Sequence, residues 1–507
     1  MKPSSTVGIV ILLSALAAVL CLCSQTFAQS NCSCLVHPDF NGDTIVDFLD
    51  FALFAQGWPN SPLSYDIAPP GAGDQLVNFK DLAVLSDCWL KDYTQLVYIT
   101  WLAHASVKIH NTQHVIYVDP RNLSITPHDA TLVLVTHSHG DHYSAPDITK
   151  VSGASTKLIA ASTVIQTHGS GQTILPGQTF DLPNVRIIGV PSYNTNKPNH
   201  PKANNWLGFI VELGGKRVYV AGDTDLIPEM STLGKIDVAF LPAGGTYTMT
   251  AAEAAQAATI IKPTLAIPYH WGTSVGTLAD AQLFARTAGC NAKVMTSGES
   301  ICSDDWAKDY SIIAHWPLDE TSGTIVHEII GDKIGTCYGD PNWLPTGGQI
   351  AGALSFDGIN DYIAAGFILN PSQGAFSVFA WVKTGTPGGV VISQWNTEGL
   401  ARNWLRTEQG TGKLMTELKG TGRDAAPLVS QTVITDDLWH RIGFVWDGAR
   451  RYLYVDGVEV AKDATAQTAL EGALSGLYIG AANNRAAGAF WSGLIDDVRI
   501  HSRAVKP

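Results

Sequence analysis

Three histidines and an aspartate lie within six residues, directly after a short apolar segment. The apolar segment is Thr131–Val135, and the polar residues are His137, His139, Asp141 and His142. The segment is typical of a buried strand, and an extended backbone would point His137 and His139 the same way. Imidazole nitrogens and carboxylate oxygens are donors that zinc and similar divalent ions prefer. The pattern predicts a metal site; the alternative is a surface loop that is merely rich in histidine.

The elements that must position these side chains are short strands separated by Gly/Pro turns, from Val97 to about Cys302. Strands are predicted at Val115–Val118, Thr131–Val135, Arg186–Val190, Phe209–Leu213, Arg217–Val220, Val238–Leu241 and Leu265–Ile267. Thr250 to Glu253 forms a capping box at the start of an Ala-rich helix, so we expect Glu253 to be structural. The rhythm indicates two sheets faced by helices.

The segment His137-Ser138-His139-Gly140-Asp141-His142 resembles the signature of the metallo-β-lactamase superfamily. Other segments resemble its metal-dependent hydrolase branch: Trp101–His104, Val118–Pro120, Ala221–Asp225, Gly244–Met249 and Pro268–Trp271. The resemblance implies an αββα sandwich over residues 97–302, with a dinuclear metal site at one edge. His139 stands where the iron-dependent oxidoreductases of the superfamily have Glu, so the resemblance favours a zinc-type hydrolase.

The resemblance also implies a ligand set. His137 and His139 would bind the first ion, Asp141, His142 and His270 the second, and Asp223 would bridge both. Alternatively, Asp223 is a turn former after a strand and His270 is a structural histidine.

One ligand position departs from the pattern. The superfamily usually places a third histidine for the first ion after the strand equivalent to Arg186–Val190, where this chain has Pro191–Asn194. Asn194 can occupy that position, or His200 can reach in from the following loop. We favour His200; if neither residue binds, the first ion is weakly held.

A pair of divalent ions, zinc or else manganese, activates water for attack on an ester, lactone or phosphoester bond of a small molecule. Asp141 is the candidate to steer or accept a proton. His104 is a candidate catalytic residue that supports a ligand or contacts substrate, although a structural role at a strand end is an equal alternative. Lys197 and Lys202 can pair with an anionic substrate, but solvated loop lysines are commoner.

An internal repeat precedes this domain, over residues 38–93. In its first copy, oxygen donors occupy positions of an EF-hand-like loop: Asp39, Asn41, Asp43, the Ile45 carbonyl, Asp47 and Asp50. The second copy keeps Asp74, the Leu76 carbonyl, Asn78 and Asp81. Such oxygen cages bind Ca²⁺. The repeat resembles a type I dockerin, which implies calcium and a cohesin-like protein partner; the alternative is an acidic turn before an amphipathic helix.

After residue 312 short alternating strands with Gly/Asn/Asp turns predict an all-β sandwich. Segments such as Leu354–Tyr362 and Ile495–Ile500 resemble a laminin-G-like, concanavalin-type jelly roll over residues 312–507. Its exposed aromatic residues can stack on carbohydrate, although most of its Trp and Tyr are expected in the core. Asp357 and Asp361 are expected to be turn residues rather than calcium ligands.

The N-terminal segment and the composition indicate where the protein acts and which partners are unlikely. Residues 1–28 are typical of a secretory signal peptide, with Val7–Leu22 as its apolar core, so we expect a secreted, cell-surface or periplasmic protein; a retained membrane anchor is the alternative. Export permits disulfides among the mature cysteines, which are Cys32, Cys34, Cys88, Cys290, Cys302 and Cys337. A net charge of −13 argues against a nucleic-acid partner.

The sequence therefore predicts a multidomain α+β protein: a small α calcium module, an αββα hydrolase and an all-β jelly roll. The predicted function is an exported metal-dependent hydrolase, targeted by dockerin-like and lectin-like modules. The alternative is a non-catalytic cell-surface adhesion or scaffold protein whose hydrolase domain is degenerate.

Overall fold

The structure is a computed structural model that describes residues 38–41, 43, 45–57, 81–82, 84–85, 88, 93–331, 333–396, 401–420 and 426–507. The predicted signal peptide, Cys32, Cys34 and the loop residues Asp74, Leu76 and Asn78 lie outside these ranges. The chain divides into two compact units, the second formed by Gln282–Lys293 and Asp309–Pro507. None of the described helices has the length and apolarity needed to cross a bilayer.

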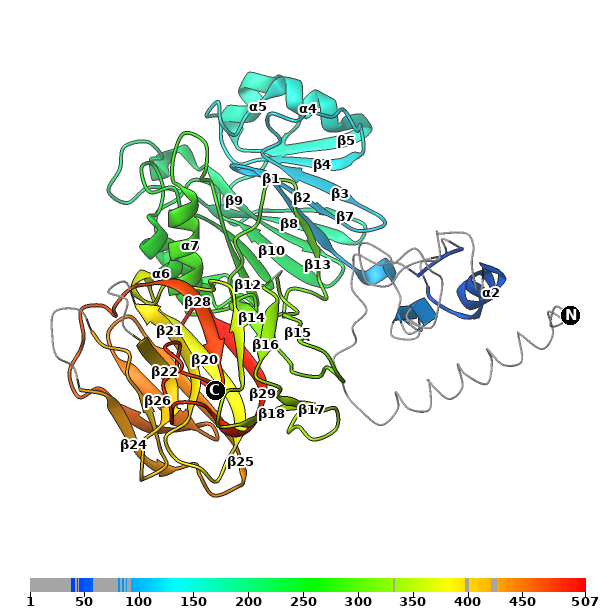
Figure 1. Ribbon diagram of the computed structural model, residues 1–507. Helices are drawn as coiled ribbons and strands as arrows, with labels where there is room; N and C mark the ends of the chain where they lie inside the picture. Colours follow the sequence, from blue (N-terminus) through cyan, green and yellow to red (C-terminus); the bar gives the residue numbers. More distant parts are fainter. Residues whose placement is uncertain are drawn as a thin grey trace, which may run out of the picture. The chain divides into compact units, whose positions relative to one another are not determined.

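The first unit contains two sheets (Figure 1). The seven-stranded sheet has the order β13-β1-β2-β3-β4-β5-β6. Its strands are β1 (Tyr98–Ala103), β2 (Ser106–His110), β3 (Val115–Val118), β4 (Ala130–Val135), β5 (Ser152–Ala160), β6 (Gln172–Thr173) and β13 (Ser300–Cys302). Pairing is antiparallel from β13 to β3 and parallel from β3 to β6.

The six-stranded sheet has the order β12-β11-β10-β9-β8-β7. Its strands are β7 (Thr179–Leu182), β8 (Val185–Pro191), β9 (Leu207–Leu213), β10 (Lys216–Val220), β11 (Val238–Pro242) and β12 (Leu265–Tyr269). The last three run parallel, so their carboxyl ends meet at one edge of the sheet. All seven strands predicted from the sequence are confirmed, with ends within two residues of the predicted ones.

Helices cover the outer faces of both sheets. On the first sheet α4 (Ala145–Val151) and α5 (Ser162–His168) bury Ile148, Val151 and Val164 against strand residues such as Val133. On the second, α6 (Ala251–Ile261) packs along β11 and β12. Thr250 caps α6 with the predicted box, since its side chain accepts from Glu253 N and Glu253 binds back to Thr250 N. The predicted αββα arrangement is therefore confirmed.

The described part of the N-terminal repeat includes the helix α2 (Phe48–Gly57) and helical residues at 81–82 and 84–85, and the 3₁₀ turn η2 (Tyr93–Gln95) follows. Phe51 and Phe54 are buried in an apolar cluster with Leu82, Leu85 and residues near β1 and β13. Cys88 and Cys302, in the same cluster, are both disulfide-bonded, whereas Cys290 and Cys337 are free thiols.

Apart from Gln282–Lys293, which include the end of the helix α7 (Leu278–Thr287), the second unit is an all-β sandwich, as predicted. One sheet holds β14 (Ile312–Trp316), β17 (Asn342–Leu344), β18 (Ala353–Asp357), β20 (Phe376–Lys383), β25 (Trp439–Trp446), β26 (Arg451–Val455), β27 (Val458–Lys462) and β29 (Ser492–His501). The other holds β15 (Ile325–Val326), β16 (Gly335–Tyr338), β19 (Tyr362–Ala365), β21 (Val390–Asn396), β22 (Ala401–Thr407), β23 (Lys413–Thr416), β24 (Leu428–Val433) and β28 (Ala473–Ile479). Four fully buried tryptophans anchor the core between them: Trp316, Trp404, Trp446 and Trp491.

Candidate metal centre

The candidate site lies where strands of both sheets of the first unit end. His137, His139, Asp141 and His142 follow β4; Asp223 follows β10, and His270 follows β12 directly. His200 belongs to the loop between β8 and β9, and His104 forms the turn between β1 and β2. The backbone also joins the two sheets here, because His270 N donates to His104 O at 2.9 Å.

The first group of donors comprises His137, His139 and His200. One ring nitrogen from each lies within 4.8 Å of the others. His137 Nε2 is 3.1 Å from His139 Nδ1, and the His200 ring centroid is 5.1 and 5.0 Å from those of His137 and His139. Of the two residues that the sequence left open for the third position, the structure places His200 there.

Asn194 instead supports His200. Its Oδ1 accepts hydrogen bonds from His200 N at 3.0 Å and His200 Nδ1 at 2.9 Å. Its amide nitrogen is occupied by Asp225 Oδ1 and the Tyr247 carbonyl oxygen, so Oδ1 is the acceptor. The proton of His200 therefore sits on Nδ1, which leaves the Nε2 lone pair facing the site.

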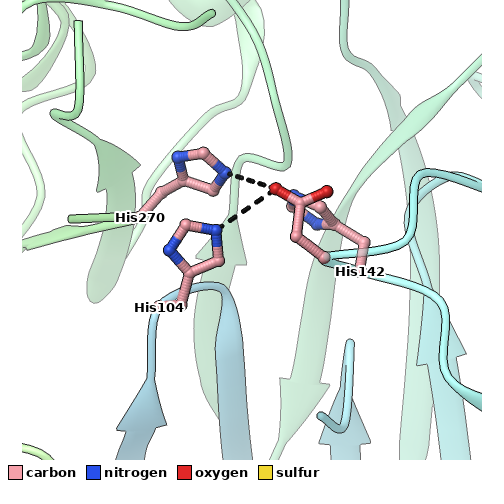
Figure 2. A group of neighbouring side chains, drawn as sticks. His104, His142 and His270 are labelled. Atoms are coloured by element: carbon pink, nitrogen blue, oxygen red, sulfur yellow. Dashed lines mark hydrogen bonds and ion pairs between the residues drawn. The ribbon is translucent and has the colours of Figure 1, made fainter. Parts of the chain in front are cut away.

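The second group comprises Asp141, His142, His270 and His104. Figure 2 shows His104 and His270 on one side of a carboxylate and His142 on its other side; the dashed lines to His104 and His270 identify this carboxylate as that of Asp141. Asp141 Oδ2 lies 3.3 Å from His104 Nε2, 3.6 Å from His270 Nε2 and 3.9 Å from His142 Nε2. His104 Nδ1 is 2.9 Å from Thr273 Oγ1. His104 thus contacts the candidate ligand Asp141 and does not line the open pocket.

Asp223 connects the two groups. Its Oδ1 lies 3.1 Å from His142 Nε2 and 3.2 Å from His270 Nε2, whereas its Oδ2 lies 3.2 Å from His200 Nε2. Each carboxylate oxygen therefore faces a different group, which is the arrangement that a bridging ligand needs.

Unsatisfied buried atoms indicate that the site is built for cations. His142 Nε2, His200 Nε2, His270 Nε2 and Asp223 Oδ1 are buried and have no hydrogen-bond partner by geometry. Burying such groups without partners is costly. Nitrogen lone pairs and carboxylate oxygens that converge in this way fit divalent metal ions.

The charges around Asp223 support the same interpretation. Burial opposes the charge of Asp223, but His142 and His270 outweigh it and hold its pKa well below the ordinary value. Burial likewise disfavours the charged form of His142. The nearby carboxylates of Asp223 and Asp119 have a larger effect than burial, so the pKa of His142 is raised. If only protein atoms are present, the negative charges of the buried carboxylates have to be balanced by protonated imidazoles. A bound metal ion would supply this positive charge instead and would leave the imidazoles neutral, as metal ligation requires.

Two supporting residues had no predicted role. The buried carboxylate of Asp119 accepts hydrogen bonds from His142 Nδ1 at 2.7 Å, Thr136 N at 2.8 Å and Thr136 Oγ1 at 2.7 Å. Thr136 Oγ1 is also 3.0 Å from His137 Nδ1. Asp119 thus fixes the proton of His142 on Nδ1 and aims Nε2 at Asp223. The signal available in the sequence was an aspartate at the end of the strand beside the histidine-bearing one.

Three residues around the site hold left-handed backbone conformations that are unusual for residues other than glycine. They are His104, Asp119 and His270, with φ of +48°, +47° and +57°. Such conformations persist where the surrounding structure enforces them, and they concentrate at functional sites.

A small pocket of about 120 Å³ opens onto the two groups. It is lined by His139, Asp141, Asn199, His200, Asp223 and Tyr247. The Asp141 side chain is 40% exposed, which gives it access to this opening. Asn199 and Tyr247 were not predicted as site residues, because neither type nor spacing distinguishes them from other loop residues.

The two loop lysines are ion-paired rather than free for substrate. Lys197 Nζ binds Asp225 Oδ1 at 2.5 Å. Lys202 Nζ binds Glu229 at 2.9 Å and lies over the Tyr193 ring. The Lys202 side chain is 63% exposed, in keeping with the solvated loop lysine that the sequence favoured. The Lys197 side chain is 21% exposed and is held by Asp225, so it fits neither predicted alternative.

Part of the predicted calcium loop is described. Asp39, Asp43 and Asp50 each place one carboxylate oxygen within 4.8 Å of the others. Buried Asp50 accepts from Phe40 N, Asn41 N and Asp47 N, and Ile45 N donates to Asp43. Asp81 of the second copy is buried. In the second unit, Asp361 accepts from the backbone of Asp340 and Asp357, as a turn residue does.

Comparisons with known proteins agree with these units. Residues 98–270 match the beta-lactamase superfamily domain, and residues 357–507 match the Concanavalin A-like lectin/glucanases superfamily. A metal-dependent hydrolase of Pyrococcus abyssi is 34% identical over 221 residues, which cover 39% of this chain and 96% of that protein. One from Pyrococcus furiosus is 34% identical over 228 residues, covering 41% and 99%. The solved structure of a metal-dependent hydrolase from Parabacteroides distasonis is 36% identical and covers 39% of this chain and 92% of its own, with a TM-score of 0.35.

Proposed function

The chain belongs, through its first unit, to the metal-dependent hydrolases of the metallo-β-lactamase superfamily, and from this membership we propose a dinuclear zinc enzyme. Its reaction is hydrolysis of an ester, lactone or phosphoester bond in a small molecule. The observation that carries this proposal is Asp223, whose two oxygens face different groups of histidines.

His137, His139 and His200 would hold one ion, Asp141, His142 and His270 the other, and Asp223 would touch both. When bound, such ions act as Lewis acids that lower the pKa of water and polarise the bond to be cleaved. The protein's own residues set the geometry. Asp119 and Asn194 fix the protons of His142 and His200 on the nitrogens remote from the centre.

Asp141 combines two roles in this proposal. His104 and His270 overcome the effect of burial and keep its pKa below the ordinary value, so it stays a carboxylate. His104 holds its Oδ2 from one side, while its exposed face borders the pocket. From there it can orient the attacking water and pass a proton towards the leaving group.

The pocket dimensions favour a small scissile group. A volume of about 120 Å³ admits a few heavy atoms, with the rest of the substrate outside. Lys197 and Lys202 are held by carboxylates, so they contribute little net positive charge for an anionic substrate. We therefore favour an ester or lactone over a phosphoester.

The test is hydrolysis by purified protein before and after chelation. We expect turnover of a panel of aryl esters, lactones and phosphodiesters to fall at least 100-fold with a chelator and to return with zinc or manganese. His137→Ala should lose activity to a similar extent, because it removes a buried ligand. The matched control is His128→Ala, an exposed histidine of the same unit whose ring binds the Ser152 carbonyl oxygen.

Chelator-insensitive turnover, or a His137→Ala variant as active as the wild type, would contradict the proposal. The rival function, a scaffold with a degenerate hydrolase domain, depended on a missing third ligand to the first ion. The placement of His200 beside His137 and His139 weighs against that rival.

The proposal extends to location and attachment. We infer export, supported by the disulfide-bonded Cys88 and Cys302, and a calcium-dependent, dockerin-like module with a cohesin-like partner, supported by the Asp39, Asp43 and Asp50 group. Carbohydrate is the partner inferred for the second unit, supported by the half-exposed Tyr338 ring stacked on Tyr362. Recovery of the native protein from the cytosol would contradict this placement; recovery from the medium or the cell surface would support it.

A further inference from the structure

The loop between β8 and β9 that carries His200 has a polar, exposed tip. Residues 195–199 form this tip and belong to no helix or strand. All five are polar residues or proline, and all but Lys197 are exposed. At the base of the tip Asn194 N donates a hydrogen bond to His200 O at 2.7 Å. Burial of apolar side chains therefore contributes little to the position of the tip, which has to depend on polar contacts.

Asp225 makes such contacts with the tip. Its side chain is 4% exposed, and it follows Asp223 by two residues. Asp225 Oδ2 accepts hydrogen bonds from Thr195 N at 2.8 Å and from Thr195 Oγ1 at 3.2 Å. Its Oδ1 accepts from Asn194 Nδ2 at 3.1 Å and from Lys197 Nζ at 2.5 Å. One buried carboxylate therefore holds three of four consecutive residues of this loop.

The same short segment, residues 223–225, also holds the base of the loop. Tyr193 N donates to Thr224 Oγ1 at 3.3 Å, and Asp225 N donates to Tyr193 O at 3.0 Å. Asp223, at the start of the segment, is the residue whose two oxygens face different groups of histidines. The position of His200 relative to Asp223 is therefore set largely by this segment.

Asn194 connects Asp225 with the ring of His200. Its Nδ2 donates to Asp225 Oδ1, and its Oδ1 accepts from His200 Nδ1 at 2.9 Å. On the other side of that ring, His200 Nε2 lies 3.2 Å from Asp223 Oδ2. Two successive hydrogen bonds thus join Asp225 to a candidate ligand of the first ion. The donors of the second group come from other segments of the chain.

The ion pair of Lys197 with Asp225 differs in burial from its neighbour in the same loop. The side chains of Lys197 and Asp225 are 21% and 4% exposed, whereas those of Lys202 and Glu229 are 63% and 31% exposed. Water screens the second pair, so its contribution is small. Removal of Lys197 would leave the buried charge of Asp225 uncompensated, which is costly.

We propose that Asp225 is a positioning residue that, together with Lys197, fixes the loop so that His200 can bind the first ion. This inference rests on the dinuclear centre proposed above. Because the loop carries no donor of the second group, loss of the anchor should release the first ion and retain the second. The anchor would thus set the affinity of one ion without being a ligand of either.

Lys197→Met tests this role, because it keeps the aliphatic stem of the side chain and removes the charge. The number of zinc ions on the full-length protein is measured across a concentration series of a competing chelator. We expect Lys197→Met to lose one ion at a chelator concentration roughly ten times lower than the wild type does, and the other ion at the wild-type concentration. The matched control is Lys202→Met, which should release both ions as the wild type does.

Turnover provides a second readout. At limiting zinc the kcat of Lys197→Met should fall, and excess zinc should restore it, since every candidate ligand remains. Lys197→Arg should recover most of the lost affinity, because it keeps the positive charge. A general structural defect would instead release both ions together, lower the unfolding temperature and persist in excess zinc.

Asp225→Asn, which removes the charge at the other end of the ion pair, should behave like Lys197→Met. Release of both ions together from Lys197→Met, or identical chelator series for Lys197→Met and Lys202→Met, would overturn the proposal. A wild-type protein that holds fewer than two chelatable zinc ions would contradict the dinuclear centre itself, and that result is seen before any variant is compared.

Discussion

Three of the site's histidines have the ring nitrogen that faces away from the metal centre held by a different partner. Asp119 holds His142, Asn194 holds His200, and Thr273 contacts His104. Because these partners fix the ring orientations before any ion arrives, the site pays less entropy on binding. The supporting residues should therefore control metal affinity without being ligands.

Asn194→Ala tests this role at the residue scale. Removal of Oδ1 frees the His200 ring, and we expect zinc affinity of the His137, His139 and His200 group to fall about 10- to 100-fold. Activity should fall at limiting zinc and recover in excess zinc, since no ligand is lost. Zinc titration against a competing chelator, with activity measured in parallel, provides both values.

The matched control is Asn204→Ala, a change in the same loop that removes no described side-chain hydrogen bond. If Asn194→Ala bound zinc as tightly as this control, His200 would not depend on Asn194. If excess zinc failed to restore activity, Asn194 would have a further role at the reacting atoms.

Individual site residues differ in how far the sequence could predict them. His137, His139, Asp141 and His142 are adjacent, so their spacing alone indicates a site. The choice between Asn194 and His200 stayed open because both lie in one loop, and spacing does not show which side chain reaches inward. The pairing of Lys197 with Asp225 depends on two loops meeting, which only the structure shows.

At the scale of elements, the site exists because parallel strands end at a common edge. The carboxyl ends of β10 and β12 deliver Asp223 and His270, and the end of β4 delivers the histidine-rich turn. These strands were predictable, since each is a short apolar segment bounded by turn residues. The order of strands within each sheet was not, because it depends on long-range pairing.

His110, at the end of β2, should make the stability of the first unit depend on pH. Its ring stacks on Tyr98 with centroids 5.0 Å apart, and burial, with help from Lys108, lowers its pKa to about 4. In the unfolded chain a histidine titrates near 6.5. Between these values the unfolded state binds more protons, so the contribution to stability is full above pH 6.5 and is lost as the pH falls towards 4.

We expect His110→Phe, which keeps an aromatic ring, to reduce the loss of stability between pH 7 and pH 4.5 by roughly 1–2 kcal/mol. Denaturant unfolding of the first unit at several pH values measures the slope for both proteins. Parallel slopes would show that His110 does not carry this pH dependence.

At the scale of the whole molecule, the sequence separated a hydrolase-like part from an all-β part, and both folds are confirmed. It did not anticipate that residues 282–293 group with the all-β unit, because nothing in their composition sets them apart. The burial of Asp496 could not be predicted from the sequence either, since Ile495-Asp496-Asp497 looks like an ordinary strand with two acidic residues close to a turn. Burial and unpaired atoms become visible only in three dimensions.

The central claim is that distant histidines and aspartates form one dinuclear centre. Anomalous diffraction at the zinc edge, from crystals of chelated and zinc-reconstituted protein, tests it most directly. We predict two peaks roughly 3.5–4 Å apart, one among His137, His139 and His200 and the other among Asp141, His142 and His270, with Asp223 between them. Zinc peaks only at other positions, or none in this region, would contradict the account.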